Sequence, residues 1–208
     1  MATPQQTVSI SAPNFEHATF TLRGDTPYMQ ARFGAKAMQA MRDKMTAGST
    51  ARKGTKREPR DFARDFEEAQ HRSSEGWIGI PAPALRNACI DACRMVGFQM
   101  TRAKMSIFVM PDGFDATDGT PLIRLIADEP EQTEMVTRNA TGVADIRVRP
   151  MWRTWGAVVT VRFDADQFTL QDVTNLLARA GQQVGIGEGR PFSKSSAGLD
   201  FGRFTLEG

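Results

Sequence analysis

The chain has 208 residues, of which 40% are hydrophobic and 24% charged, enough for one domain with a substantial core. No window approaches the roughly 18 uninterrupted apolar residues that a membrane-spanning helix needs, so a helical membrane protein is excluded. The formal net charge is +2, but residues 42–64 hold eight basic and three acidic side chains, so this stretch carries +5 and the remainder −3.

The N-terminal residues and the two cysteines predict a cytoplasmic protein. Residues 1–13 lack a basic start followed by an apolar run, so we expect no secretory signal. Cys89 and Cys93 are four residues apart in a helix-like stretch, where we expect two buried, reduced thiols. A metal site at this pair would need further ligands, and the chain has two histidines, His17 and His71.

The first third of the chain predicts one strand and two short helices. Residues 17–24 alternate polar and apolar side chains and stop at a Gly-Asp-Thr-Pro turn, which predicts a strand. Apolar residues at helical spacing predict a helix over 34–45, and a second helix is expected over 61–71. Between them, residues 46–59 are small, polar and basic, and we expect a mobile loop.

The middle of the chain predicts a well-defined helix and two strands. Prolines at its entry and an apolar stripe predict a helix over 82–96, with Gly97 as its C-cap. Strands are expected near 104–110 and 121–127. Residues 128–154 fit a β-ribbon or a long irregular excursion.

The last third predicts a strand, a helix, a glycine-rich loop and a closing strand. The strands cover 155–163 and 200–206, and the helix covers 169–180. Thr169 is the expected N-cap of this helix, and Gly181 is its expected C-cap.

Taken together, the elements predict an α+β fold with a ferredoxin-like, RRM-like βαββαβ core. Two insertions interrupt this core, a helical and basic one at 25–80 and an extended one at 128–154. We expect a single domain spanning 1–208.

The glycine-rich loop has the spacing G-x-G-x-G at Gly185, Gly187 and Gly189, followed by Arg190 and Lys194. The order here is helix, glycines, strand, which excludes a dinucleotide fingerprint because that motif needs strand, glycines, helix. The glycines predict close approach of the backbone to another chain or to a phosphodiester. The alternative is a tight connection that needs glycine to turn.

Two basic segments favour a polyanionic partner. The first lies in the 25–80 insertion and comprises Arg52, Lys53, Lys56, Arg57 and Arg60, which would neutralise phosphates as a flexible clasp. The second interleaves arginines with tryptophans, a pattern that suits a single nucleic-acid strand, and comprises Arg147, Arg149, Trp152 and Arg153. The alternatives are a solvated linker and a strand with a basic face and core tryptophans.

Catalytic residue sets are scarce in this sequence. Two histidines in dissimilar contexts provide no Ser-His-Asp set. Asp61, Asp65 and Glu68 could share one side of a helix and bind Mg²⁺, but a solvated charged face explains them as well. We therefore expect no enzyme, no cofactor and no metal, with a metal-dependent nuclease as the runner-up.

Three segments together resemble the RAMP superfamily, which includes the backbone subunits of CRISPR effector complexes. They are LRGDTPYMQARF at 22–33, GIPAPALR at 79–86, and VGIGEGRP at 184–191 with Gly198 and FGRF at 201–204. The pattern also looks like that of small bacteriophage proteins, which would work in the bacterial host cytoplasm. RAMP ribonucleases typically use a histidine near the first strand or helix, and His17 does not match, so cleavage is not transferred.

The resemblance implies an RRM-like fold, head-to-tail filament assembly and binding of one RNA or DNA strand. It points to Arg86, to the loop 185–190 and to the basic residues of both insertions. Implied partners are CRISPR proteins or phage recombination and replication proteins. The third hypothesis is a phage protein that self-assembles without nucleic acid.

Overall fold

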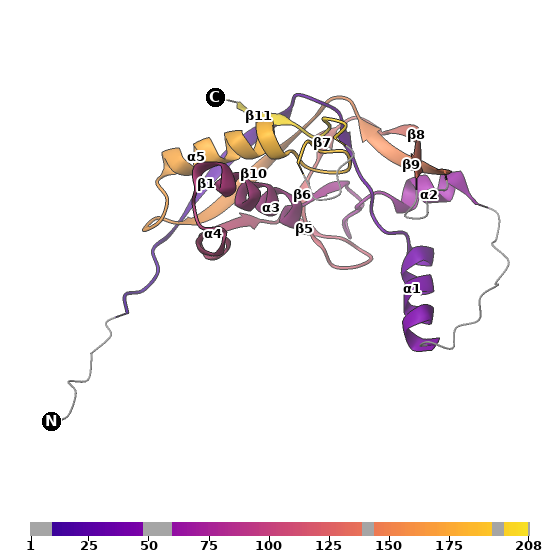
Figure 1. Cartoon of the computed structure of the whole chain (residues 1–208), viewed down its shortest axis with the longest axis horizontal. Helices are drawn as coiled ribbons and strands as arrows, with labels where there is room; N and C mark the ends of the chain where they lie inside the picture. Colours follow the sequence, from indigo (N-terminus) through magenta and orange to yellow (C-terminus); the bar gives the residue numbers. More distant parts are fainter. Residues whose placement is uncertain (1–9, 48–59, 139–143, 193–197, 208) are drawn as a thin grey trace.

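The computed structural model describes residues 10–47, 60–138, 144–192 and 198–207. Over these residues the chain is mixed α+β, with three antiparallel sheets and five α-helices. The main sheet has the strand order β11-β1-β10-β4, and every neighbouring pair in it is antiparallel (Figure 1). These strands are β1 (Phe15–Gly24), β4 (Ile107–Met110), β10 (Trp155–Asp164) and β11 (Phe204–Glu207). A short strand, β7 (Ile126–Ala127), pairs with the start of β10.

One face of this sheet forms the core. Side chains of β10 alternate between buried and partly exposed, as expected for a strand with one face on a core. The buried set is Trp155, Ala157, Val159, Val161 and Phe163. Helices α3 (Ala82–Ala92) and α5 (Leu170–Arg179) bury their apolar residues in the same cluster. The opposite face of the sheet carries the alternate side chains of each strand.

The predicted helix over 82–96 is confirmed in position and in its C-terminal glycine. Regular α-helix ends at Ala92, and a 3-10 helix, η2 (Cys93–Val96), tightens the last turn. Gly97 follows at φ 69°, the left-handed conformation that a C-cap glycine supplies. Cys89 and Cys93 are both buried thiols, and burial raises the pKa of Cys89 to about 12.

The predicted strand over 104–110 is wrong at its start. Helix α4 (Met100–Ser106) occupies those residues, and β4 begins at Ile107, where pairing with Phe163 begins. The region 121–127 also differs, because β6 (Pro121–Arg124) leaves the main sheet. It pairs with β3 (Gly79–Pro81) and β5 (Gly113–Phe114) in a small second sheet. Strand partners at these distances along the chain are set by tertiary packing rather than by local pattern.

Helix α5 begins as predicted. Thr169 and Asp172 exchange side-chain to backbone hydrogen bonds in a capping box. Gly181 does not cap the helix, which corrects that prediction. The helix continues as a π-helix, η3 (Ala180–Val184), and the chain turns at Gly185 with φ 70°. Gly181 is required for packing instead, because a Cβ there would overlap the carbonyl oxygen of Phe204.

The two insertions meet beside the main sheet (Figure 1). The β-ribbon interpretation of 128–154 is confirmed as a hairpin of β8 (Glu131–Arg138) and β9 (Ala144–Trp152). Strand β2 (Tyr28–Met29) from the first insertion pairs with the end of β9, and α2 (Phe62–Glu68) packs against β9. Helix α1 (Ala35–Ala47) covers the predicted 34–45 segment. Within the described residues, no helix combines the length and apolar character that crossing a bilayer requires.

Replacing Gly202 by alanine tests the glycine-rich connection. Gly202 has φ 68°, and a Cβ on it would overlap the carbonyl oxygen of Ile186. We expect Gly202→Ala to lower the free energy of unfolding by about 3 kcal/mol or more, from backbone strain plus overlap. Urea denaturation measures this. Gly97→Ala is the matched control, since Gly97 has a similar φ of 69° and open space around its Cβ position. A loss no larger than that of the control would show that the connection relaxes.

Candidate functional site

The exposed face of the main sheet presents a cluster of two rings and two guanidinium groups. Residues directly opposite on paired strands share a face, so Arg162 of β10 lies between His17 of β1 and Phe108 of β4. Phe15 and Phe108 meet edge to face, with 5.8 Å between ring centroids. The Arg162 Cζ atom lies 4.1 Å from the Phe15 centroid and 5.2 Å from that of Phe108.

Arg86 completes this cluster from the edge of the sheet. Its Nε donates to the carbonyl oxygen of Ile107 at 2.8 Å, and its Nη2 donates to that of Lys104. Its Cζ lies 4.8 Å from the Phe108 centroid. We call Phe15, Arg86, Phe108 and Arg162 the sheet-face cluster. It combines the ring faces and cationic groups that bind bases and phosphates of a single strand.

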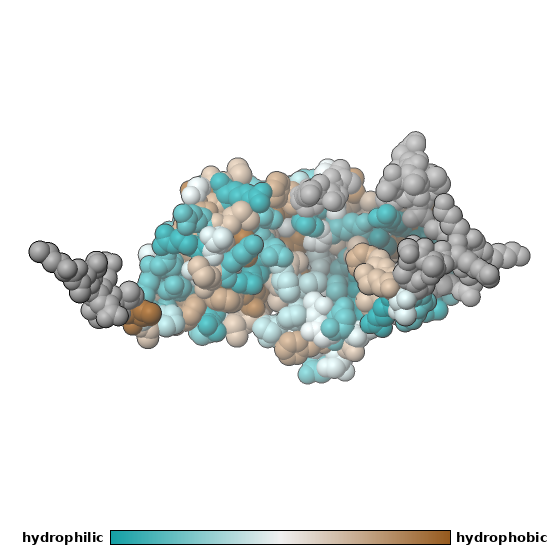
Figure 2. Space-filling view, turned by 60° about the horizontal axis from the view of Figure 1, so that its bottom comes forward, coloured by the Kyte–Doolittle hydropathy of each residue, from teal (hydrophilic) through white to brown (hydrophobic). Residues whose placement is uncertain are grey.

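The surroundings of this cluster are those of a solvated sheet. Thr19 and Thr160, opposite one another on β1 and β10, join their hydroxyls at 3.1 Å, and Val158 is 46% exposed. Over the side of the molecule shown in Figure 2, hydrophilic and hydrophobic residues intermingle without a broad apolar area.

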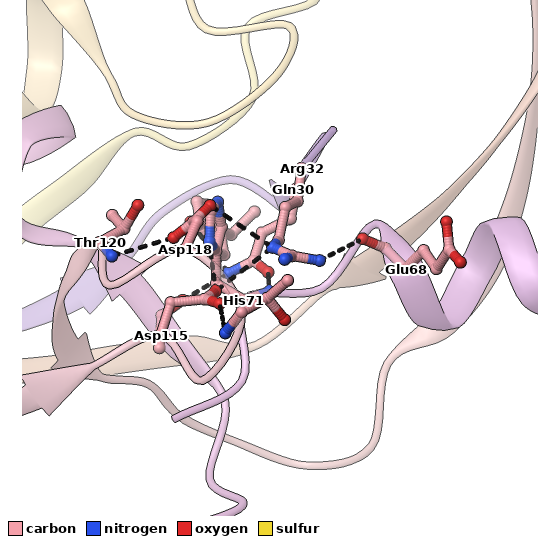
Figure 3. Close-up of polar contacts among 10 residues, drawn as sticks. Gln30, Arg32, Glu68, His71, Asp115, Asp118 and Thr120 are labelled. Atoms are coloured by element: carbon pink, nitrogen blue, oxygen red, sulfur yellow. Dashed lines mark hydrogen bonds and ion pairs between the residues drawn. The ribbon is translucent and has the colours of Figure 1, made fainter. Parts of the chain in front are cut away.

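A second group of polar side chains lies where the first insertion meets the small sheet (Figure 3). It brings together Gln30 and Arg32 after β2, His71 before β3, and Asp115 and Asp118 in the turn between β5 and β6. The Gln30 amide nitrogen donates to the carbonyl oxygen of Gly79 at 2.7 Å, and its Oε1 accepts from the His71 backbone N–H at 2.9 Å. Gln30 therefore fixes the position of His71.

The two carboxylates of this polar group are held in the same way. Oδ1 of Asp115 accepts from the Thr117 N–H at 2.8 Å, and Oδ1 of Asp118 accepts from the Thr120 N–H at 2.9 Å. Their Oδ2 atoms remain for the centre of the group. Asp115 Oδ2 lies 2.9 Å from His71 Nδ1 and 3.3 Å from Arg32 Nε, and Asp118 Oδ2 lies 3.9 Å from Arg32 Nε.

Burial sets the electrostatics of this polar group. The side chains of Asp115 and Arg32 are 1% and 7% exposed, so each ion has its main counterion inside the protein. Burial lowers the pKa of His71, although its hydrogen bond with Asp115 acts in the opposite direction. Desolvation raises the pKa of Asp118, but the Thr120 hydrogen bonds and the charge on Arg32 outweigh it, so the net shift is downward.

The predicted glycine loop is held by contacts within the chain. Gly185, Gly187 and Gly189 all have positive φ. A Cβ on Gly187 would overlap the Met29 carbonyl oxygen and the Tyr28 ring, and the N–H of Glu188 donates to that same carbonyl at 2.9 Å. These contacts favour the interpretation of a tight connection over approach to a phosphodiester.

Arg190, predicted beside the glycine loop, and Arg147 and Arg149, predicted in the second basic segment, all contact residues of this loop. Arg190 donates to the carbonyl oxygens of Gly187 and Phe192. Arg149 pairs with Glu188, and Arg147 lies 3.9 Å from the other oxygen of that carboxylate. Glu188 thus links the glycine loop to the β8–β9 hairpin.

The remaining predicted residues are dispersed. Trp152 is 2% exposed and stacks on Tyr28 with centroids 5.7 Å apart, so we assign it to the core rather than to a binding surface. Arg153 pairs with Glu131 on the exposed hairpin, and Arg60 bonds to Asp65 and to the Ile146 carbonyl oxygen. Four basic loop residues and one glycine-loop residue lie outside the described residues: Arg52, Lys53, Lys56, Arg57 and Lys194.

The carboxylates considered for Mg²⁺ have other partners. Asp61 caps α2 by accepting from the Arg64 N–H. Asp65 pairs with Arg60, and Glu68 pairs with Arg64. The helical face is therefore a network of ion pairs, which matches the alternative of a charged surface.

Sequence reasoning missed most of both groups described above. Of the sheet-face cluster it identified Arg86, and of the polar group it noted His71 as one of two histidines. Alternation along β10 was a usable signal, because it places Arg162 on the face opposite the core. The spacing of Arg32, His71 and Asp115 along the chain carried no signal.

No protein-family model matches this chain, and no curated protein matches it.

Replacing Asp115 by asparagine tests the buried ion pair. The change leaves the Arg32 guanidinium without its nearest counterion in a buried site, so we expect a loss of about 3 kcal/mol or more in the free energy of unfolding. Urea denaturation measures the loss. Asp112→Asn is the control, because Asp112 accepts the Arg124 N–H nearby and is not in the polar group. Equal losses in the two variants would contradict a special role for the ion pair.

Proposed function

We propose that this protein binds single-stranded nucleic acid, without enzymatic turnover, on the exposed face of its main sheet. The sheet-face cluster carries the proposal. A base can stack on Phe15, on Phe108 or on a guanidinium plane, and every base has such a face, so this binding tolerates any sequence.

We further infer that the main sheet and its two helices form a ferredoxin-like, RRM-like core. In chain order the elements β1, α3, β4, β10, α5 and β11 read β-α-β-β-α-β. Across the sheet the four strands lie in the order β11, β1, β10 and β4, which is 4-1-3-2 when they are numbered along the chain. Each neighbouring pair is antiparallel. This order supports the assignment and agrees with the resemblance to the RAMP superfamily. RRM domains bind single strands on the corresponding sheet face.

The charges on this face also support the proposal. Arg23 and Arg162 lie on it, and Arg86 borders it. The acids on this face are Asp164, which lies opposite Phe15, and Glu207, which lies opposite Thr21. Arginines close to stacking rings can contact phosphates while the bases cover the rings. Binding should therefore weaken as salt rises, because phosphate contacts release counterions.

The resemblance to the RAMP superfamily adds two points to the proposal. The protein would self-associate along the nucleic-acid strand, and its partners would be CRISPR or phage proteins. Sedimentation with and without a labelled strand separates this self-association from a protein that assembles alone. Full-size assemblies formed without nucleic acid, with no strand bound, would favour the self-assembly hypothesis instead.

A double variant of the cluster is the direct test. Phe108→Leu with Arg162→Gln keeps bulk and polarity but removes a ring face and a cation. We expect a loss of affinity of about tenfold or more, since one base–ring stack contributes about 1–3 kcal/mol. Fluorescence anisotropy with a labelled oligonucleotide at two salt concentrations measures it.

The chain offers a matched control on the helix side. Arg102 lies over Phe98 with 5.5 Å between Cζ and the ring centroid, and Phe98 packs on Phe168. Phe98→Leu with Arg102→Gln should leave affinity unchanged. Equal affinity for the cluster variant and the wild type, or the absence of binding at low salt, would refute the sheet face as the binding surface.

The basic segment of the first insertion is tested separately. An Arg52, Lys53, Lys56 and Arg57 to alanine variant should bind more weakly and depend less on salt. Each lost phosphate contact lowers the slope of log affinity against log salt by about 0.7 for single strands. An unchanged slope would remove this segment from the interface while leaving the sheet face intact.

A further inference from the structure

We propose that His71, Asp115 and Asp118 bind one divalent transition-metal ion, and that Arg32 donates a hydrogen bond to a water or oxyanion on that ion. This site is separate from the sheet-face cluster and does not depend on the proposed nucleic-acid binding. Figure 3 shows these side chains converging from three segments that are far apart in the sequence.

The ligand atoms are already close together. Each of the three residues offers one ligand atom, and these atoms all lie within 4.8 Å of one another. Ligands around one metal ion with bonds near 2.1 Å are separated by about 3 to 3.5 Å. An inward movement of Asp118, whose side chain is more exposed than that of Asp115, would bring the three ligand atoms into that range.

The carboxylates are pre-positioned for this role. Backbone N–H groups of Thr117 and Thr120 hold one oxygen of Asp115 and of Asp118. The second oxygen of Asp115 lies next to both His71 and Arg32, and the second oxygen of Asp118 lies near Arg32. Gln30 holds the His71 backbone from the other side. Such supporting hydrogen bonds orient the ligands of known metal sites.

Arg32 provides the second, independent observation. Its side chain is 7% exposed, and neither Nε nor Nη2 has a hydrogen-bond partner, although Nε lies in ion-pair range of Asp115. Its Nη1 is used by the Glu68 carbonyl oxygen at 3.2 Å. A buried N–H without an acceptor is costly, and a water or oxyanion on the metal would supply the acceptor.

The charges leave room for a cation. Two carboxylates face one guanidinium, so the group carries one uncompensated negative charge with Asp115 fully buried. One imidazole and two carboxylates suit Mn²⁺ or Zn²⁺, and three protein ligands leave coordination positions open for a small oxygen ligand. Asp118, with its side chain 32% exposed, lies on the side from which an ion can enter.

Titration of the metal-free full-length protein with Mn²⁺, followed by electron paramagnetic resonance, tests the proposal. We expect one bound ion per chain and a rise in melting temperature, because a ligand that binds the folded state stabilises it. Zn²⁺ in a parallel calorimetric titration should compete for the same site.

Asp118→Asn is the informative variant, because an amide oxygen can still accept the Thr120 N–H while the anionic ligand is lost. We expect Mn²⁺ affinity to fall by about tenfold or more, the size of effect seen when groups supporting a metal are removed. Asp112→Asn, which alters a carboxylate that accepts the Arg124 N–H outside the site, should bind as the wild type does. If Asp118→Asn does not fold, His71→Gln takes its place with the same expectation.

Absence of Mn²⁺ and Zn²⁺ binding by the wild type at millimolar concentration would overturn the proposal and leave the group as a structural ion-pair network. Equal Mn²⁺ affinity of Asp118→Asn and wild type would overturn it too. Neither result bears on strand binding, which the sheet-face variants test.

Discussion

The antiparallel pairing of β1 with β10 is the contact on which the rest of the structure depends. It joins the two longest strands of the main sheet and brings one face of each beneath α3 and α5. Because side chains alternate across a strand, burying one row necessarily exposes the next. Phe15 and Arg162 are therefore placed together on the exposed face by the same register that buries Phe163 and Val161 in the core.

Aromatic packing connects the first insertion to this sheet. Tyr28 lies between Trp152 and Trp155, with centroid distances of 5.7 and 5.2 Å, and Trp155 donates from its indole N–H to the Thr26 carbonyl oxygen at 2.8 Å. Burial of the Tyr28 hydroxyl raises its pKa well above the usual value. Gly187 lets the glycine-rich loop close against the same ring. Trp152, Trp155 and Gly187 thus contribute to one packing arrangement around Tyr28.

The buried polar group shows how a costly arrangement can be maintained. Arg32 and Asp115 are removed from water, which a single ion pair compensates poorly unless further hydrogen bonds satisfy both partners. Asp115 is well satisfied, through Thr117 and His71, whereas Arg32 retains donors without acceptors. This imbalance distinguishes the group from the exposed pairs of α2, such as Arg64 with Glu68, where solvent completes the hydrogen bonding.

Local pattern in the sequence alone determined the elements whose signals lie within a few residues. Examples are the strand at 155–163, the N-cap at Thr169, and the helix that ends at Gly97, because alternation, capping and left-handed glycine are short-range effects. Tertiary structure alone decided where β4 begins, and that Gly181 packs rather than caps.

The same division separates what could be predicted of the candidate sites from what could not. Arg86 was found from a local motif. For Trp152 the sequence left two alternatives, a nucleic-acid-binding surface and the core, and the structure buries it in the core. The meeting of Phe15 with Phe108, and of Arg32 with Asp115, joins residues more than 80 positions apart. No short-range pattern encodes such a contact, since its free energy arises from strand register and burial that exist only once the chain has folded.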